Sequence, residues 1–271
     1  MTRLAVVGAG KLGEALLSGL LRAGRSPADL MVTARRASRA EELSQRYDVP
    51  AVSNLDAAAQ ASILLLTVKP QDIEPLLTEL APATSPERLV VSVVAGIPTA
   101  LIERRLGDDT PVVRVMTNTP VLVDEAMSAI SAGAHATEEH LAATESIFRS
   151  VGRVLRVPES QQDAVTALSG SGPAYFFFLV EAMIDAGILL GLPRAVAADL
   201  MVQTVLGSAV MLRDTGEHPV QLREAVTSPG GTTINAIREL ENHGVRAAFL
   251  AAIEAARDRA RDLGRAANTA D

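Results

Sequence analysis

Short apolar runs and amphipathic segments alternate along the first half of the chain. The apolar runs predict strands over Leu4–Val7, residues 30–33, 62–68 and 89–94, and Val112–Met116. Apolar positions spaced by three and four residues predict helices between them, over residues 10–22, 38–46 and 72–80, and Thr99–Leu106. Ser38 is the expected N-cap of the second helix. Continuously apolar strands between amphipathic helices are typical of a parallel sheet covered on both faces.

The pattern changes after Pro158, where strand signals stop. Before it, two short strands are predicted at Ala126–Ala132 and 153–157, with a helix over 138–150. After it, helices are predicted over residues 161–190 (interrupted at 169–173), 194–213, 231–242 and 245–263, with turns at 191–193, 216–219 and 228–230. We therefore expect an α/β fold, with a Rossmann-like doubly wound parallel sheet in domain 1–158 and an all-α domain in 159–271.

Composition narrows the classes of function. A chain of 271 residues with 48% apolar side chains can fill two cores, and the run Phe176-Phe177-Phe178 in a predicted helix is expected to pack in one of them. A net charge of −7 disfavours binding to nucleic acid or to a membrane surface. Without cysteine there are no disulfides and no thiolate nucleophiles. No signal peptide and no charge-free run of bilayer length is found, so we expect a cytoplasmic protein.

A glycine-rich loop follows the first predicted strand. It reads Gly8-Ala9-Gly10-Lys11-Leu12-Gly13 and opens a predicted helix. In this motif the first glycine allows a tight turn, the second lets a pyrophosphate approach the backbone, and the third lets helix and strand pack closely. The helix N-terminus adds unpaired N–H groups and partial positive charge. The loop therefore predicts a dinucleotide site, whereas a glycine turn without a ligand is the alternative.

The end of the second predicted strand distinguishes NAD from NADP. An NAD site usually places an acidic residue there to bond the ribose 2′-hydroxyl. This chain instead has Arg35 and Arg36, whose guanidinium groups suit a 2′-phosphate. A pair of solvated arginines at a helix start is the alternative, although positive charge is slightly unfavourable there. We expect NADPH as the cofactor, with NADH as a weaker one.

Two further segments follow the third and fifth predicted strands. They read Val68-Lys69-Pro70-Gln71 and Arg114-Val115-Met116-Thr117-Asn118-Thr119-Pro120. Ligands of open α/β sheets bind outside the carboxyl ends of the strands, where a nicotinamide and a substrate would meet. Asn, Thr and Pro are also common in ordinary turns, so these residues by themselves leave both readings open.

A third segment precedes the helix predicted at 231–242 and reads Thr227-Ser228-Pro229-Gly230-Gly231-Thr232-Thr233. Such a turn exposes several N–H groups in one concavity, and with the helix dipole it forms an anion site. The hydroxyls of Ser228, Thr232 and Thr233 add donors. Two glycines and three hydroxyls exceed what a plain N-cap needs, so the turn favours a site for a small carboxylate.

Taken together, these segments and Ala167-Leu168-Ser169-Gly170-Ser171-Gly172-Pro173-Ala174-Tyr175 resemble the pyrroline-5-carboxylate reductase family over nearly the whole chain. The resemblance implies NADPH-dependent reduction of 1-pyrroline-5-carboxylate to L-proline by hydride transfer, the last step of proline biosynthesis. It also implies that the all-α domain is a dimerisation domain and that the site forms between one subunit's cofactor domain and its partner's helices. The expected homo-oligomer is a dimer, or a decamer of five dimers in some members.

The resemblance also implies roles for individual residues. The substrate carboxylate would be held by Ser228, Gly230, Gly231 and Thr232. Thr233 would approach the ring nitrogen as the catalytic hydroxyl, and Glu217 would interact with the ring. Asn54 would lie near the adenosine, and Val68, Lys69 and Pro70 would line the nicotinamide. The chain departs from the usual family pattern at Thr117, where proline is common, and at Ala34, where many members have a polar residue.

Three rival readings fit parts of the chain. A β-hydroxyacid dehydrogenase uses a lysine in its helical half, but no lysine follows Lys69. A deazaflavin:NADP oxidoreductase resembles only the first domain, and a non-catalytic NADPH sensor does not explain the turn at 227–233. The histidines His135, His140, His218 and His243 have no metal-ligand spacing, so we expect no metal.

Overall fold

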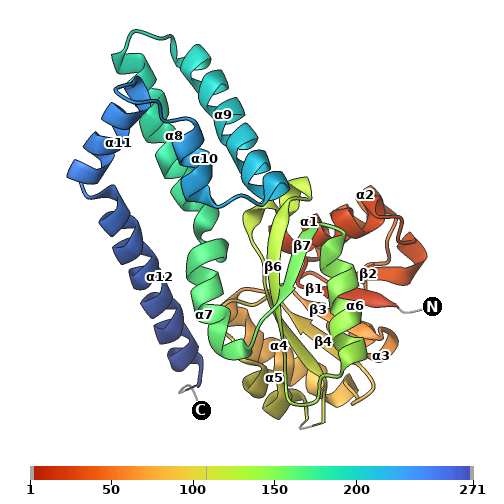
Figure 1. Ribbon diagram of the computed structural model, residues 1–271. Coiled ribbons are helices and arrows are strands. Elements are labelled where there is room, and N and C mark those ends of the chain that lie inside the picture. Colours follow the sequence, from red (N-terminus) through yellow and green to blue (C-terminus); the bar gives the residue numbers. More distant parts are fainter. Residues whose placement is uncertain (1–2, 108, 269–271) are drawn as a thin grey trace. The chain divides into compact units, whose positions relative to one another are not determined.

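In the computed structural model, which describes residues 3–107 and 109–268 (the last four by backbone only), seven strands form one sheet (Figure 1). The strands are β1 (Leu4–Val7), β2 (Leu30–Val32), β3 (Ile63–Leu66), β4 (Leu89–Ser92), β5 (Val112–Met116), β6 (Ala126–Ala132) and β7 (Gly152–Arg156). Their order in the sheet is β2-β1-β3-β4-β5-β6-β7. The chain therefore winds in both directions from β1, as expected of a doubly wound sheet.

The predicted parallel sheet is confirmed from β2 to β5, where each neighbouring pair is parallel. The expectation is wrong for the next pair, because β6 runs antiparallel to β5, while β7 runs parallel to β6. The two strands β5 and β6 are joined by a short 3₁₀ segment, Thr119–Val123, rather than by a crossover helix. A short connection of this kind suits antiparallel neighbours, since a parallel return needs a longer crossover.

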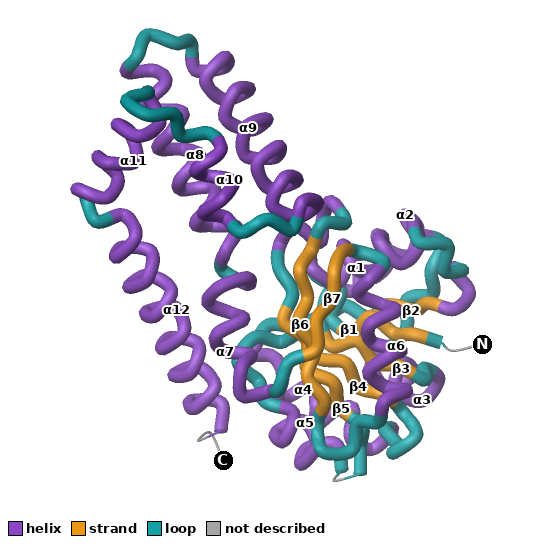
Figure 2. The backbone as a smooth tube through the Cα atoms, viewed as in Figure 1, coloured by secondary structure: helices purple, strands orange, loops and turns teal. Residues whose placement is uncertain are grey.

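Helices cover both faces of the sheet (Figure 2). One core holds side chains of α1 (Lys11–Arg22), α2 (Ala37–Tyr47) and α6 (Glu138–Arg149), and the other holds side chains of α3 (Asn54–Gln60), α4 (Ile73–Leu80) and α5 (Thr99–Leu106). Strand residues alternate between the cores, so Leu4 and Val6 pack on the first and Ala5 and Val7 on the second. This double burial explains why β1, β2 and β3 are apolar at every position.

The chain forms two compact units. The first holds the sheet and extends to Gly172, and it also includes the chain from Ala256 onward; the second runs from Pro173 to Ala255. Within the first unit lie α7 (Gln162–Val165) and a π-helical turn at Thr166–Gly170. The second unit contains most of α8 (Gly172–Leu189), together with α9 (Arg194–Thr215), α10 (Pro219–Ala225), α11 (Thr232–Asn242) and the first part of α12 (Val245–Asn268).

The helices of the second unit expose much apolar surface in the single chain. Phe176, Phe177 and Phe178 are 60%, 69% and 74% exposed, so the expectation that they pack in a core of this chain is wrong. Two helical stretches, Glu159–Leu189 and Arg194–Thr215, are long and apolar enough to cross a membrane by length and composition. Apolar surface on this scale requires a cover, because exposing it to water is costly.

Local corrections concern helix ends and two short helices. Ser38 lies inside α2 rather than at its N-cap, which is Arg36. The helices α3 and α10 occupy segments for which no helix was predicted, and α10 begins at Pro219, the last residue of the predicted turn, whose fixed φ suits a first helical position. The interruption predicted at 169–173 corresponds to the end of a π-helical turn at Thr166–Gly170, and after Ser171 the helix α8 begins at Gly172.

Candidate functional site: a dinucleotide cradle and an anion-binding turn

The carboxyl ends of β1, β3, β4 and β5 share one edge of the sheet, because these strands are parallel. The glycine loop follows β1, Val68-Lys69-Pro70 follows β3, and Thr117-Asn118 follows β5. The structure therefore brings together three segments that are far apart in sequence, at the edge where open α/β sheets bind their ligands.

Two threonines that sequence reasoning missed hold the glycine loop in place. Gly8 N donates to Thr33 Oγ1 (3.1 Å) and Ala9 N donates to the Thr33 carbonyl (2.8 Å). On the other side, the Thr67 hydroxyl lies 3.0 Å from the Val7 carbonyl and 3.1 Å from the Gly8 carbonyl. Both threonines directly follow a strand that neighbours β1, and this placement is the signal that could have identified them.

Glycine is required by the structure at Gly8 and Gly13, and at Gly10 it leaves open space. Gly8 has a φ of +78°, and an added Cβ would overlap Val68 Cγ1. At Gly13 an added Cβ would lie 2.6 Å from Thr67 Oγ1, where α1 packs on the sheet. At Gly10, the N-cap of α1, the nearest atom to an added Cβ is the Gly8 carbonyl at 3.9 Å, so the space above it is open. An open space at a helix N-terminus fits the pyrophosphate of a dinucleotide.

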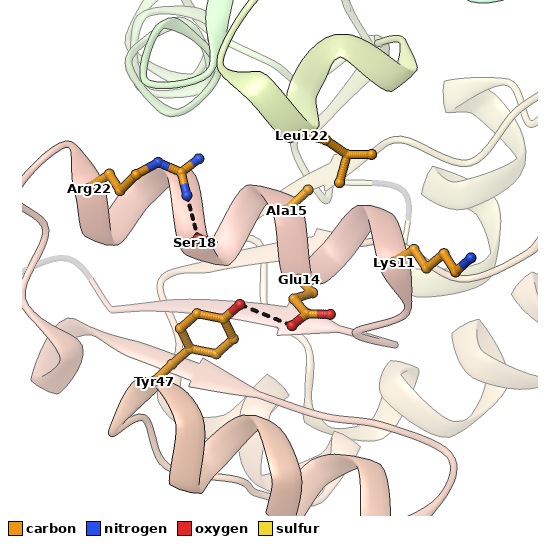
Figure 3. Close-up of a pocket in the computed structure, with 7 residues that line it drawn as sticks. All are labelled: Lys11, Glu14, Ala15, Ser18, Arg22, Tyr47 and Leu122. Atoms are coloured by element: carbon orange, nitrogen blue, oxygen red, sulfur yellow. Dashed lines mark hydrogen bonds between the residues drawn. The ribbon is translucent and has the colours of Figure 1, made fainter. Parts of the chain in front are cut away.

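The remaining residues of the loop are Ala9, which precedes α1, and Lys11 and Leu12, which are its first two residues. Ala9 is buried, whereas Lys11 and Leu12 begin the helix at the open end of the loop. Lys11 also lines a hollow along α1 with Glu14, Ser18 and other residues (Figure 3). The first amides of a helix have no partner within it, and those of α1 therefore face the cradle.

The predicted 2′-phosphate residues lie at the start of α2. Arg36 is its N-cap residue, and Arg35 directly precedes it. The Arg35 side chain is 86% exposed and its Nη1 lies 3.4 Å from Asp72 Oδ1, a loose surface pair of little strength. Both guanidinium groups are therefore accessible to an anion.

The other predicted cofactor residues lie on neighbouring connections. Asn54 is the first residue of α3, and its Nδ2 donates to Glu79 Oε2 (2.9 Å). Val68 is half-buried against Gly8, and Lys69 is the exposed N-cap of a 3₁₀ turn that starts at Pro70. All of these positions lie in the first unit.

Asn118 has a position that sequence reasoning did not define. Its Oδ1 accepts a hydrogen bond from Met127 N (3.0 Å), and its Nδ2 donates to the Ser169 carbonyl (3.2 Å). One amide thus joins the end of β5 to β6 and to the π-helical turn. Next to it, Ser128 Oγ donates to Thr117 Oγ1 (2.9 Å), so the unusual Thr117 takes part in anchoring this loop.

The predicted carboxylate site lies in the second unit, at the opening of α11. Gly230 has a φ of +69°, and Gly231, which has no side chain to cap the helix, is the N-cap residue. Gly231 N donates to the Ser228 carbonyl (3.1 Å), and an added Cβ at Gly231 would overlap Ser228 Oγ. Ser228 lies in this turn, Thr232 and Thr233 are the first two residues of α11, and no side chain caps the helix. An uncapped helix N-terminus next to hydroxyl-bearing residues suits an anion.

Glu217 lies in the same unit, in the turn between α9 and α10, and is exposed. Within residues 3–107 and 109–268, no group of three or more His, Asp or Glu side chains could hold a metal ion.

A doubly wound sheet with a glycine loop at its carboxyl edge, followed by a helical unit, is the architecture of many oxidoreductases that use a nicotinamide dinucleotide. Pyrroline-5-carboxylate reductase of Mycobacterium tuberculosis is 48% identical over 97% of each chain. The solved structure of the Coxiella burnetii pyrroline-5-carboxylate reductase matches with a TM-score of 0.91 and 37% identity, covering 97% of this chain and 98% of that one. The chain belongs to the pyrroline-5-carboxylate reductase family.

Two family models cover the two parts of the chain. Residues 159–263 match pyrroline-5-carboxylate reductase dimerisation, and residues 3–96 match NADP oxidoreductase, coenzyme F420-dependent. The structure of the Plasmodium falciparum pyrroline carboxylate reductase, which has NADP bound, matches with a TM-score of 0.87 and 28% identity, covering 97% of this chain and 98% of that one. The exposed apolar helices thus belong to a dimerisation domain, and the chain is a homo-oligomer.

Proposed function

We propose that this enzyme reduces 1-pyrroline-5-carboxylate to L-proline with NADPH, the last step of proline biosynthesis. The observation that carries the proposal is the opening of α11, where a glycine-glycine turn and three hydroxyls surround unpaired helix amides. A dinucleotide cradle alone would fit many reductases, but this second site matches a small substrate with one carboxylate.

The chain's own residues bind and orient the substrate. Ser228, Gly230, Gly231 and Thr232 hold its carboxylate through backbone amides and hydroxyls, which fixes the ring in one orientation. The Thr233 hydroxyl, one residue further along the first turn of α11, orients the ring nitrogen and helps to move its proton. Glu217 contacts the ring from the turn before α10.

The reaction needs little acid–base catalysis by the protein, because a protonated cyclic imine already accepts a hydride readily. When bound, NADPH supplies that hydride to the imine carbon. The protein's contribution is to hold the imine carbon at near-attack distance and to exclude water from the site.

We assign cofactor binding to domain 1–158. The residues are Gly8, Ala9, Gly10, Lys11, Leu12 and Gly13 for the pyrophosphate, Arg35 and Arg36 for the 2′-phosphate, Asn54 for the adenosine, and Val68, Lys69 and Pro70 for the nicotinamide. The cradle at Gly10 and the exposed guanidinium groups support this assignment.

Domain 159–271 dimerises the protein and carries the substrate turn. The assembly we propose is a dimer in which a second copy covers the apolar faces of α8 and α9, with a decamer of five dimers as the larger assembly that the family resemblance implies. We also propose that the protein acts in the cytoplasm, without membrane or nucleic-acid partners, since apolar helices that are covered by a second copy need no bilayer and a net charge of −7 disfavours binding to nucleic acid.

The reaction is tested by following NADPH consumption by the purified full-length protein with 1-pyrroline-5-carboxylate, in parallel with an NADH series. We expect rapid oxidation of NADPH, with a rate that saturates as the concentration of either the imine or the cofactor is raised. The kcat/KM should be higher with NADPH than with NADH. Stoichiometric formation of proline, measured by amino-acid analysis, confirms the product. Bound NADPH without any turnover of this imine would contradict the substrate assignment.

The preference for NADPH should depend on the two arginines at the start of α2. In the double variant Arg35→Ala, Arg36→Ala we expect kcat/KM for NADPH to fall about tenfold or more, because each bidentate contact to the 2′-phosphate is charge-assisted. The value for NADH should change by less than about twofold. Arg104→Ala, on the exposed side of α5, removes an arginine elsewhere and should affect neither. An equal loss with both cofactors would contradict the assignment.

A further inference from the structure

Glu14, in the first turn of α1, accepts hydrogen bonds from three side chains of α2. Arg39 Nη2 donates to its Oε2, and Arg46 Nη1 and Tyr47 Oη each donate to Oε1 at 2.9 Å. Figure 3 shows Glu14 directed at Tyr47 from the helix that begins at the glycine loop. Since Arg39 and Arg46 are two helical turns apart, one carboxylate holds both ends of the same face of α2.

This cluster is half shielded from water and remains charged. The side chains of Arg39 and Glu14 are only 18% and 19% exposed. Burial alone would raise the pKa of Glu14, but the hydrogen bonds from Arg39 and Tyr47 and the charges of Arg39 and Arg46 hold it below its usual value. The pKa of Tyr47 is raised by burial and by its bond to Glu14, so it stays a donor. A shielded, multiply bonded carboxylate orients a helix more firmly than an exposed ion pair does.

The helix that Glu14 holds carries the accessible guanidinium groups at its start. Arg36 is the N-cap of α2 and Arg35 precedes it, while Arg39 lies one turn further on and is engaged by both Glu14 and Glu42. The network therefore binds the guanidinium group of Arg39, whereas those of Arg35 and Arg36 remain exposed to solvent.

We propose that Glu14 is a positioning residue for cofactor specificity. By fixing α2 on α1, it sets the distance from the pyrophosphate cradle at the start of α1 to Arg35 and Arg36, and so aligns them with the ribose 2′-phosphate. This inference rests on the proposed NADPH site. Glu14 acts through α2 and does not contact the nicotinamide, so the rate of the chemical step does not depend on it.

A competing explanation predicts that replacing Glu14 strengthens, rather than weakens, the binding of a 2′-phosphate. If Arg39 were itself a phosphate ligand held back by Glu14, then removing the Glu14 charge would release a guanidinium and tighten binding of any 2′-phosphate. Loss of a nearby negative charge would also strengthen anion binding in general. A weakening that is selective for the 2′-phosphate is therefore evidence for positioning.

The test uses the full-length protein and two probes that differ only in the 2′-phosphate, 2′,5′-ADP and 5′-AMP, with binding measured by titration calorimetry or by competition with NADPH fluorescence. In Glu14→Gln, which keeps the shape but places an amide N–H against Arg39, we expect 2′,5′-ADP to bind about tenfold more weakly. Binding of 5′-AMP should stay within about twofold, and kcat at saturating NADPH should not change.

Two further variants distinguish a selective effect on 2′-phosphate binding from a general loss of stability. Tyr47→Phe removes one of the three donors, so we expect the same selective effect at about two- to threefold. Asp124→Asn breaks the other ion pair of α1, in which Arg22 contacts Asp124, and should leave the ratio of the two affinities unchanged. Thermal unfolding of each variant reports its stability separately.

Each outcome decides a different point. Equal weakening of both probes in Glu14→Gln, or tighter binding of 2′,5′-ADP, overturns the positioning role. If Arg35→Ala, Arg36→Ala leaves 2′,5′-ADP binding unchanged, the 2′-phosphate assignment fails instead. Turnover of 1-pyrroline-5-carboxylate by the unaltered protein tests the proposed reaction independently of both.

Discussion

Replacing Gly8 with alanine is expected to abolish measurable NADPH binding. Gly8 has a φ of +78°, where a residue with a Cβ costs roughly 1–2 kcal/mol. The added Cβ would also overlap Val68 Cγ1, so the loop after β1 and the loop after β3 could not both keep their places. Because this loop is the proposed pyrophosphate cradle, we expect the change to act on cofactor binding directly. Fluorescence titration with NADPH measures it.

A matched control separates backbone strain from collision. Gly24 has a φ of +90°, but within the described part of the chain an added Cβ there meets nothing within 4 Å. Gly24→Ala should therefore lower the free energy of unfolding by about 1 kcal/mol and leave NADPH binding intact. Unaltered NADPH affinity in Gly8→Ala would show that the loop does not form the cradle.

Replacing Thr233 with valine, which has the same shape without the hydroxyl, is expected to lower kcat by roughly ten- to a hundredfold. Removing a positioned hydroxyl from a reacting nitrogen typically costs this much. The KM for NADPH should hardly change, because Thr233 belongs to the substrate turn at the start of α11. Steady-state kinetics with 1-pyrroline-5-carboxylate measure both quantities.

Thr227→Val provides the control for Thr233. The Thr227 hydroxyl donates to the Arg223 carbonyl at the end of α10 (2.6 Å), so it is already used within the chain. We expect kcat within about twofold of the unaltered protein. Full activity in Thr233→Val would remove Thr233 from the catalytic role.

Some helices and strands have the bounds that the sequence predicts, and others do not. The bounds of α5, β5 and β6 agree with those predicted, because strong apolar periodicity or a continuous apolar run is a local property of the sequence. The predicted start of α2 was wrong because Ser38 is a good N-cap by type, whereas the helix begins at Ala37 after the N-cap residue Arg36 and has no side-chain cap. The helix α3 was missed because a seven-residue segment rich in alanine has little periodicity.

Some residues of the candidate site were predicted from the sequence, and others are seen only in the structure. Glycine spacing, in a loop between a predicted strand and a predicted helix, predicted the cradle, and the structure shows that Gly8 and Gly13 fill positions where a Cβ would collide with Val68 or Thr67. Thr33, Thr67, Glu14 and Asn118 were not identified, because each acts through a partner that is 25 or more residues away, or on another strand. A single sequence contains no signal for such a pairing.

The sequence by itself determined the α/β class, the change to an all-α region and the use of NADP, and it predicted the glycine loop and the turn at 227–233 as binding sites. These follow from local spacing and from the chemistry of the residue types. Only the tertiary structure decided the antiparallel pairing of β6 with β5, the anchoring of the glycine loop by Thr33 and Thr67, and the fixing of α2 by Glu14. The physical reason is that these depend on which distant groups meet when the chain packs, and packing is settled by the whole set of contacts rather than by any one segment.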